Sequence, residues 1–509
     1  MIISVNFVMK MKVIQILIGL FLYQTITGQE IKGGICGTEY LEDIKQEMLR
    51  NREEFKNFQF QRGAITYVPV KVFMVALNDG TGAVSPLNAL RMMCQLNTAY
   101  KEIDLQFYIK ELKLLSNSTI AETPRSSGGT LQIQLNKDRN AVNIFITHKI
   151  LDGVAGYYSG PAGSSSDFIV IQKEYIMDVR VAPHEVGHYF SLPHTFHGWD
   201  SEAWDPVKHG NPVDKFAPDG ITINEYADSS NCGPKNVGDG FCDTPADYNF
   251  GANNCTYTLQ AMDPIGKLVK PQTNNFMNYF FGCSNYIFTP QQKDAVLSSL
   301  NSTNRRDIRG TSPPVTTVIT ETAKLLSPAN GAPTVSADTV TLDWEEVPGA
   351  TSYLVQYDVV PTFELFVQNF ITKESKLKIS NLVLNRTYHW RVIPYNEYST
   401  CFADAPRFTF KAGALTAVKD LPQVKSLSVF PNPIQTNQQL NLVLDCYSPF
   451  QGSISIYDLT GKQVLNVAAE RFTSGINNKV ININQLKSGV YSLVLHGQQG
   501  LASRKLLVL

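Results

Sequence analysis

The chain has 509 residues, of which 43% are hydrophobic, and its 44 basic and 45 acidic residues give a formal net charge of −1. This length is typical of about three domains, and the hydrophobic content is sufficient for packed cores. Because charges of both signs are interleaved, the sequence excludes a basic patch that would bind nucleic acid or an anionic membrane.

Residues 1–28 have the pattern of a secretory signal peptide. Lys10 and Lys12 precede an apolar run at residues 13–23, and small or polar residues follow at 25–28. The apolar run is too short to cross a bilayer comfortably, and no other stretch is long enough. We therefore predict an exported chain without a transmembrane segment, the alternative being an N-terminal anchor.

The eight cysteines favour disulfides in an oxidising compartment. Four of them cluster in one region and predict two bridges, although the sequence does not choose among the three possible pairings. These four are Cys232, Cys242, Cys255 and Cys283.

Residues 29–62 are polar and charged, and we expect a short helix at residues 40–58. Residues 63–302 then alternate between β-branched runs and helical patterns, which indicates an α/β (α+β) domain. The expected strands are at residues 65–77, 105–110, 141–148 and 168–172, and the expected helices at 86–102 and 291–300.

Within this domain, His184, Glu185 and His188 form a His-Glu-x-x-His motif. On a helix, residues four apart share one face, so the two imidazoles can bind one zinc ion. Pro193 is expected to end the helix just before His194. The chain can then turn and bring a third nitrogen near the metal. Three protein nitrogens and one open position are typical of a catalytic zinc, and Glu185 lies where it can accept a proton from an activated water.

The motif continues with His-Thr-Phe at residues 194–196, Gly-Asp-Gly-Phe-Cys-Asp-Thr-Pro at 238–245 and Met-x-Tyr at 277–279. In this extended form it resembles the metzincin endopeptidases, and most of all the cytophagalysin branch of the pappalysin family. The resemblance covers roughly residues 30–300 and implies a secreted peptide-bond hydrolase that acts on proteins or peptides. It implies that Met277 forms the floor under the metal and that Tyr279 stabilises the oxyanion.

Two positions depart from the family pattern. Ser191 occupies a place where the family usually has glycine, and a serine at positive φ costs about 1 kcal/mol. The chain after Tyr279 has no acidic residue of the kind that selects basic substrates, so we expect an apolar or broad pocket. Two alternatives remain open: a secreted adhesin or binding protein with an inactive metzincin-like fold, and a zinc peptidase whose third ligand is a downstream glutamate.

The resemblance also bears on Cys36, because many metzincins are kept inactive by a propeptide cysteine or acid on the zinc. Cys36 is therefore a candidate latency switch in a propeptide at residues 29–62, the alternative being a disulfide with Cys94. Relatives bind calcium near residues 239–244, and Asp239, Asp243 and Thr244 offer oxygen ligands for Ca²⁺, although a solvated turn fits as well. His197 and His209 are expected either near the metal or as loop histidines.

Two all-β modules follow a linker at residues 303–325. Residues 326–412 contain short alternating runs separated by turns, and Trp344 together with the corner at 382–388 resembles a fibronectin type III domain. Residues 424–509 resemble the C-terminal sorting domain of the Bacteroidetes type IX secretion system. The resemblance rests on the sequential order of five motifs, at residues 427–433, 453–458, 461–464, 486–491 and 503–509. This implies recognition by that machinery and a secreted or cell-surface location.

Overall fold

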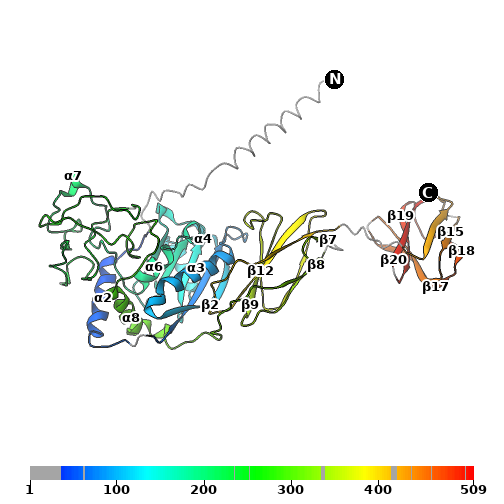
Figure 1. Cartoon of the computed structure of the whole chain (residues 1–509). Coiled ribbons are helices and arrows are strands. Elements are labelled where there is room, and N and C mark those ends of the chain that lie inside the picture. The colour runs from blue at the N-terminus through cyan, green and yellow to red at the C-terminus, as the bar shows by residue number, and fades with distance from the viewer. Residues whose placement is uncertain are drawn as a thin grey trace, which may run out of the picture.

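The computed structural model describes residues 36–60, 63–233, 235–251, 253–333, 339–413, 421–436, 438–459, 461–498 and 500–509. The predicted signal peptide and residues 29–35 lie outside the described residues. Figure 1 shows a mixed α/β part that carries most of the helices, followed by two separate all-β modules, so the protein is multidomain as the sequence indicated.

A five-stranded sheet forms the centre of the α/β part, in the order β2-β1-β3-β5-β4. The first four strands of this order are parallel, whereas β4 is antiparallel to β5 and forms one edge. The strands are β1 (Thr66–Ala76), β2 (Leu105–Ser116), β3 (Val142–Thr147), β4 (Gly156–Ser159) and β5 (Phe168–Gln172). β2 is longer than predicted because it pairs with β1 along its whole length, and β4 was not predicted.

Helices cover both faces of this sheet. The helices α3 (Pro86–Tyr100) and α6 (Val181–Tyr189) pack on one face, while α4 (Ser118–Glu122) and α5 (Ser127–Asn136) cover the other. α8 (Pro290–Asn301) begins with a capping box formed by Thr289 and Gln292. Short 3₁₀ helices connect these elements: Lys101–Ile103, Leu151–Gly153, Lys173–Tyr175 and Thr303–Ile308.

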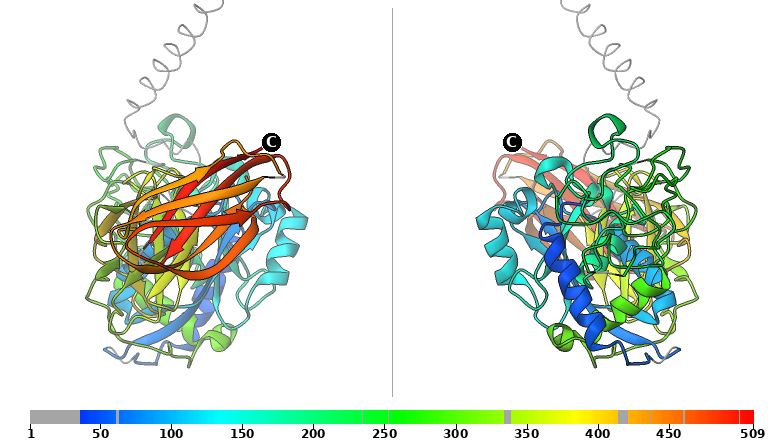
Figure 2. Two further views of the ribbon diagram at one scale, coloured as in Figure 1. Left: turned by 90° about the vertical axis from the view of Figure 1, so that its right-hand side faces the viewer. Right: turned by 90° about the vertical axis from the view of Figure 1, so that its left-hand side faces the viewer.

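The predicted N-terminal helix is α2 (Leu41–Glu54), which packs against α8. It ends before Phe58 because three aromatic side chains, Phe55, Phe58 and Phe60, pack on one another instead. Figure 2 shows α2 beside a loop-rich part of the chain, within residues 195–287, whose only regular helix among the described residues is α7 (Pro206–His209). Cys232–Cys242 and Cys255–Cys283 are disulfides there, so the two predicted bridges are confirmed.

The next module is a sandwich of two sheets, in the orders β10-β9-β12-β13-β7 and β11-β8-β6. The hydroxyl of Tyr388 accepts a hydrogen bond from Val383 N at 2.9 Å, as in a tyrosine corner. Its strands are β6 (Leu325–Ser327), β7 (Ala332–Pro333), β8 (Thr339–Trp344), β9 (Ser352–Asp358), β10 (Gln368–Thr372), β11 (Lys376–Ser380), β12 (Thr387–Tyr395) and β13 (Arg407–Lys411).

This sandwich is fastened to the free side of β2. Cys94 on α3 forms a disulfide with Cys401, so the alternative pairing of Cys36 with Cys94 is wrong. Ile109 N also donates to Glu397 O at 2.8 Å. Sequence could not reveal this bridge, because the two cysteines are 307 residues apart and meet only when the modules pack together.

The C-terminal module is a second sandwich with sheets in the orders β14-β15-β18 and β17-β16-β19-β20. Its strands are β14 (Val424–Phe430), β15 (Gln439–Cys446), β16 (Phe450–Tyr457), β17 (Gln463–Phe472), β18 (Gly475–Asn482), β19 (Gly489–Gly497) and β20 (Gly500–Val508). Among the described residues of the whole chain, no helix is both long enough and apolar enough to cross a membrane.

Candidate metal centre

The helix α6 holds the His-Glu-x-x-His motif in the core of the α/β part. It begins two residues before Pro183 and ends where Ser191 adopts a left-handed conformation with φ 66°. Leu192 N then donates to Gly187 O at 2.9 Å, which reverses the chain. This turn returns His194 to the face of the helix that carries the first two histidines.

The three histidines converge through one nitrogen each. The Nε2 atoms of His184 and His188 are 3.2 Å apart, and the Nε2 of His194 lies 3.2 Å from the first and 3.1 Å from the second. All three side chains are buried. The Sγ of Cys36 completes a group whose ligand atoms all lie within 4.8 Å of one another.

Each histidine uses its other nitrogen to donate to a fixed acceptor. The Nδ1 atoms of His184 and His188 lie 2.7 Å from the carbonyls of Phe276 and Leu192, and Nδ1 of His194 lies 2.6 Å from Asp200 Oδ1. With the protons on Nδ1, the three Nε2 lone pairs face each other and cannot hydrogen-bond among themselves. A cation bound between them would satisfy all three lone pairs.

The electrostatics favour neutral imidazoles. Burial lowers the pKa of His184 and of His188 well below the usual value, and repulsion from His194 adds to the effect. Neutral imidazole is the form that binds metal. Tetrahedral ligands at about 2.0–2.1 Å from zinc are about 3.3–3.4 Å apart, close to the separations observed here. The residues present therefore fit a zinc ion.

Glu185 lies beside this cluster, fully buried. Its Oε2 accepts a hydrogen bond from Thr38 Oγ1 at 3.1 Å, whereas Oε1 has no hydrogen-bond partner among the described residues. Burial raises the pKa of Glu185 to about 8, against the hydrogen bonds from Cys36 and Thr38 that favour its charged form. A buried carboxyl group with one uncommitted oxygen and a pKa near neutrality suits a general base.

Cys36, Gly37 and Thr38 lie along the edge strand β4. Cys36 pairs with Gly156 in the parallel sense, and Gly37 N donates to Gly156 O at 2.8 Å. Tyr158 N donates to Thr38 Oγ1 at 2.9 Å. The segment therefore extends the sheet by one short strand and places the thiol of Cys36 next to the three histidines.

Tyr279 and Met277 frame the cluster from the other side. The Tyr279 hydroxyl donates to the carbonyl of Cys36 at 3.4 Å. Met277 is fully buried under α6, where a Cβ atom on Gly187 would collide with its Sδ and lie 3.2 Å from its Cε. A larger residue at position 187 would therefore force the end of the Met277 side chain to shift.

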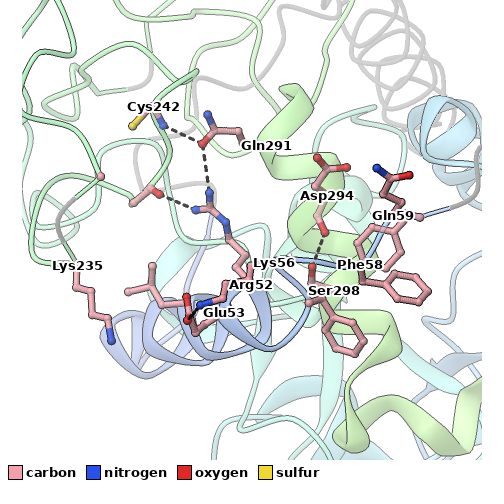
Figure 3. Close-up of a pocket in the computed structure, with 15 residues that line it drawn as sticks. Arg52, Glu53, Lys56, Phe58, Gln59, Lys235, Cys242, Gln291, Asp294 and Ser298 are labelled. Atoms are coloured by element: carbon pink, nitrogen blue, oxygen red, sulfur yellow. Dashed lines mark hydrogen bonds and ion pairs between the residues drawn. The ribbon is translucent and has the colours of Figure 1, made fainter.

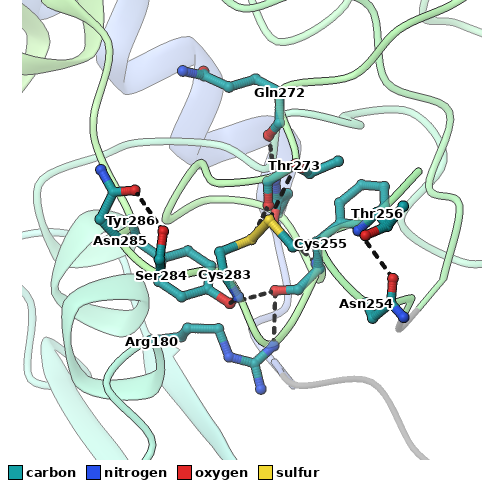
Figure 4. Close-up of a disulfide and its surroundings, with 12 residues drawn as sticks. Arg180, Asn254, Cys255, Thr256, Gln272, Thr273, Cys283, Ser284, Asn285 and Tyr286 are labelled. Carbon is teal, nitrogen blue, oxygen red and sulfur yellow. Dashed lines mark hydrogen bonds between the residues drawn. A yellow bond between two sulfur atoms is a disulfide. The ribbon is translucent and has the colours of Figure 1, made fainter.

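The chain after Tyr279 is braced from two directions. Figure 4 shows the disulfide between Cys255 and Cys283 beside Tyr286 and Arg180. Arg180 and the Tyr286 hydroxyl both donate to the carbonyl of Phe280, at 2.9 and 3.2 Å. These contacts fix the residue that follows Tyr279 and so restrict the position of its ring.

Helix α2 fastens the Cys36 segment to the loop-rich part. Glu42 Oε2 lies 2.8 Å from His197 Nε2, a hydrogen bond that lowers the pKa of Glu42 to about 2. Figure 3 shows Arg52 reaching Gln291, whose side-chain oxygen also accepts from Cys242 N, at the wall of a pocket of about 830 Å³. The polar contacts of α2 therefore involve the Cys232–Cys242 loop and α8.

The other candidate ligands lie outside the cluster. His197 is buried against Glu42, and His209, the last residue of α7, accepts from Asp205 N. Within the described ranges, no further group of three or more metal-binding side chains is as close as the Cys36 group.

The proposed calcium ligands do not act as one set. Asp243 accepts from Thr289 Oγ1 and Gln291 N, each at 2.8 Å, so it serves the start of α8. Asp239 is buried and accepts from Thr244 Oγ1 at 2.9 Å. Calcium binding by these residues stays a prediction.

Comparisons with known proteins assign the C-terminal module. Residues 428–509 match the family described as secretion system C-terminal sorting domain. The chain carries a sorting domain for secretion. This places the protein outside the cell or at its surface. No curated protein is significantly similar to the chain in sequence.

Solved structures resemble the chain at low sequence identity. A mutant of promirolysin from Tannerella forsythia is 15% identical, with 54% of this chain and 96% of that chain covered and a TM-score of 0.38. The FN1–FN3 domains of chicken CNTN1 are 11% identical, covering 40% of this chain and 70% of that chain with a TM-score of 0.19. FN3tt is 18% identical, covering 18% and 98% with a TM-score of 0.15.

Two contributors to the site escaped the sequence analysis. Asp200 orients His194, and only its place in an acidic loop soon after the third histidine hinted at this. Arg305 is buried, ion-pairs with Asp167, donates to the carbonyl of Tyr189 and lies 3.6 Å from the centre of the Tyr189 ring. It fixes the end of α6 from the 3₁₀ helix Thr303–Ile308, which lies within the predicted linker.

Proposed function

We propose that the protein is a secreted zinc endopeptidase that is made as a latent precursor. The observation that supports this most strongly is the cluster of three buried Nε2 atoms at 3.1–3.2 Å, with every Nδ1 proton already directed to another acceptor. By the family resemblance of its motif, His184, His188 and His194 are the zinc ligands.

In this proposal a zinc ion supplies Lewis-acid polarisation of the scissile carbonyl and of the attacking water. Glu185 accepts the proton of that water through its uncommitted Oε1 and later delivers it to the leaving amine. The Tyr279 hydroxyl, which now donates to the carbonyl of Cys36, donates to the oxyanion of the substrate. The Cys36 carbonyl thus stands in for a substrate carbonyl.

Latency follows from the position of Cys36. Its thiol lies in the metal cluster and 3.6 Å from Glu185 Oε2, so the segment covers the base as well as the metal. Burial raises the pKa of the Cys36 thiol, and the Glu185 carboxylate adds to this, but a bound metal reverses the preference and favours the thiolate. Removal of the propeptide is the step that opens the site.

The function is tested by peptide cleavage and metal content together. The processed wild-type protein and Glu185→Ala are incubated with a mixed peptide library, and the zinc content of each is determined. We expect one zinc in both proteins and cleavage by the wild type alone. Zinc without cleavage by the processed wild type would instead favour a binding protein with an inactive fold.

Latency is tested in the unprocessed chain with Cys36→Ala. The variant should cleave peptides without propeptide removal, whereas wild type should not. Cys446→Ala is the matched control, because Cys446 is the other free cysteine of the described residues and is buried in the sorting domain. A Cys36→Ala precursor as inactive as wild type, after its zinc content has been verified, would refute the switch.

Export through the type IX system completes the proposal. The matched family names a secretion sorting domain, and the order of motifs at residues 424–509 resembles the type IX version. Deletion of residues 424–509 should retain the protein inside the producing cell. Unchanged secretion of the shortened chain would contradict this part.

A further inference from the structure

The edge strand β4 is the place where a substrate must bind if it replaces Cys36–Thr38. Gly156 of this strand pairs with Cys36 and accepts from Gly37 N, and a Cβ atom on Gly156 would lie 3.2 Å from Glu185 Oε1. A peptide that adds to this edge therefore has its backbone next to the base. The side chains of such a peptide alternate between the two faces of the sheet.

Arg125 occupies one of these faces at the position of Gly37. It lies between α4 and α5, and its guanidinium donates to the Gly37 carbonyl and lies 4.8 Å from the centre of the Tyr157 ring. Tyr157 points to the α4–α5 side of the sheet, away from α6. The aromatic ring thus orients a guanidinium beside the edge strand β4.

The missing side chain of Gly37 points directly at this arginine. An ideal Cβ at position 37 would overlap the Arg125 guanidinium, with Cζ at 3.0 Å, and would lie 3.0 Å from Val154 Cγ2, so a side chain at this position requires the end of the Arg125 side chain to shift. Gly37 follows Cys36, whose thiol is in the metal cluster. A substrate residue in the place of Gly37 is therefore one residue from the chain position nearest the metal, and its side chain faces Arg125.

Burial raises the pKa of the Tyr157 hydroxyl, Arg125 opposes this rise and the carboxylate of Glu39 adds to it. The ring thus lies in the field of a cation from the catalytic part and an anion from the propeptide. A planar guanidinium binds carboxylates through paired hydrogen bonds, which gives it selectivity for acidic side chains over amides.

We propose that Arg125, with Tyr157 and Val154, forms a subsite next to the scissile bond that selects substrates carrying Asp or Glu at that position. This inference rests on the proposed endopeptidase function, and it names the substrate class of that site. The propeptide has glycine at position 37 and therefore places no side chain in this subsite. Such a segment can block the site without being bound as a substrate.

The test uses the full chain after removal of the propeptide by limited proteolysis. Pairs of fluorogenic peptides differ only by Glu or Gln, placed in turn at each position within three residues of the scissile bond. At one position, the wild type should cleave the Glu peptide about tenfold faster in kcat/KM than the Gln peptide. Arg125→Gln should remove this difference, and Arg125→Glu should shift the preference to Lys.

Binding separates failure of the subsite from failure of the function. The same labelled peptides are titrated into Glu185→Ala by fluorescence polarisation, and the Glu peptide should again bind about tenfold more tightly. Equal binding of every Glu and Gln pair would overturn the subsite, as would an acidic preference that survives in Arg125→Gln. Absence of cleavage by the wild type would refute the endopeptidase itself.

A control variant and a folding check complete the design. Arg139→Gln removes an exposed arginine that pairs with Asp307, and it should leave the peptide preference unchanged. Thermal unfolding of each variant is measured first. If Arg125→Glu does not fold, Arg125→Gln and Arg125→Lys decide the question, with Lys retaining part of the acidic preference.

Discussion

Ser191 allows the cost of the turn that positions His194 to be measured. It is buried, has φ 66° and forms a hydrogen bond of 3.3 Å between its hydroxyl and that of Ser299. We compare Ser191→Ala with Ser191→Gly, because both delete the hydroxyl and only alanine retains a Cβ. The difference between the two variants therefore reports the backbone strain less the greater unfolded-state entropy of glycine.

The expected changes in the free energy of unfolding have three contributions. Loss of the neutral hydrogen bond costs about 0.5–1.5 kcal/mol in both variants. Glycine also removes left-handed strain of about 1–2 kcal/mol, against an additional unfolded-state entropy of about 0.5–1 kcal/mol. We expect Ser191→Ala to be about 1 kcal/mol less stable than wild type, and Ser191→Gly to be about 0.5–1 kcal/mol more stable than the alanine variant.

The assay is calorimetric unfolding of the full zinc-loaded chain. The transition that shifts in both variants belongs to the α/β part, and the difference of about 0.5–1 kcal/mol corresponds to a separation of about 1–3 °C in Tm. An alanine variant that melts at or above the glycine variant would refute the reasoning. Strain at the turn would then not contribute to the position of His194.

Three further predictions concern buried charges and the inter-domain bridge. Asp167→Asn should destabilise the α/β part by about 3–5 kcal/mol in thermal unfolding, because it leaves buried Arg305 without its ion-pair partner. Burial raises the pKa of Asp247 from 3.8 to about 6, so its folded form keeps a proton that the unfolded chain releases. Stability should therefore fall as pH rises from about 4 to about 6, and Asp247→Asn should flatten that fall in urea titrations. Finally, a cut between residues 311 and 320 should yield two fragments on a gel only after reduction, because Cys94 and Cys401 join the two modules.

Local sequence patterns were sufficient for most of the fold. The β5 strand has the predicted bounds, and α8 differs from its prediction by one residue at each end, because its periodicity and its Thr289 cap are local signals. The spacing of His184 and His188 predicts a shared helix face for the same reason. Long helices and strands with a strong hydrophobic periodicity are determined mainly by the residues within them.

Tertiary packing determines what the sequence did not show. β4 has four residues and begins with glycine, so its strand character depends on β5 beside it. Asp200 and Arg125 lie in turns and Arg305 in a short 3₁₀ helix, where no periodicity indicates the direction of a side chain. Their roles arise from segments that meet only in the folded chain, which is also why Cys94 finds Cys401.

Thr38 is a second residue of the propeptide segment that can contribute to latency, besides the thiol of Cys36. Its hydroxyl donates to Glu185 Oε2 at 3.1 Å and accepts from Tyr158 N at 2.9 Å, so it links the base to the edge strand. Thr38→Val has nearly the same shape but loses both bonds, together with the one that the hydroxyl accepts from Cys36 Sγ at 3.0 Å, and it leaves the Tyr158 amide without this acceptor. Because a hydrogen bond to a neutral group contributes about 0.5–1.5 kcal/mol, the precursor's basal cleavage should rise by about twofold to tenfold.

The rise in Thr38→Val should remain below that of Cys36→Ala, since the thiol still lies in the metal cluster. Basal cleavage is expressed as a fraction of the activity after propeptide removal, which cancels any difference in zinc loading. Thr38→Ser keeps the hydroxyl and serves as the control. If Thr38→Val is as latent as Thr38→Ser, the thiol alone maintains latency, and the contact between Thr38 and the base is incidental to it.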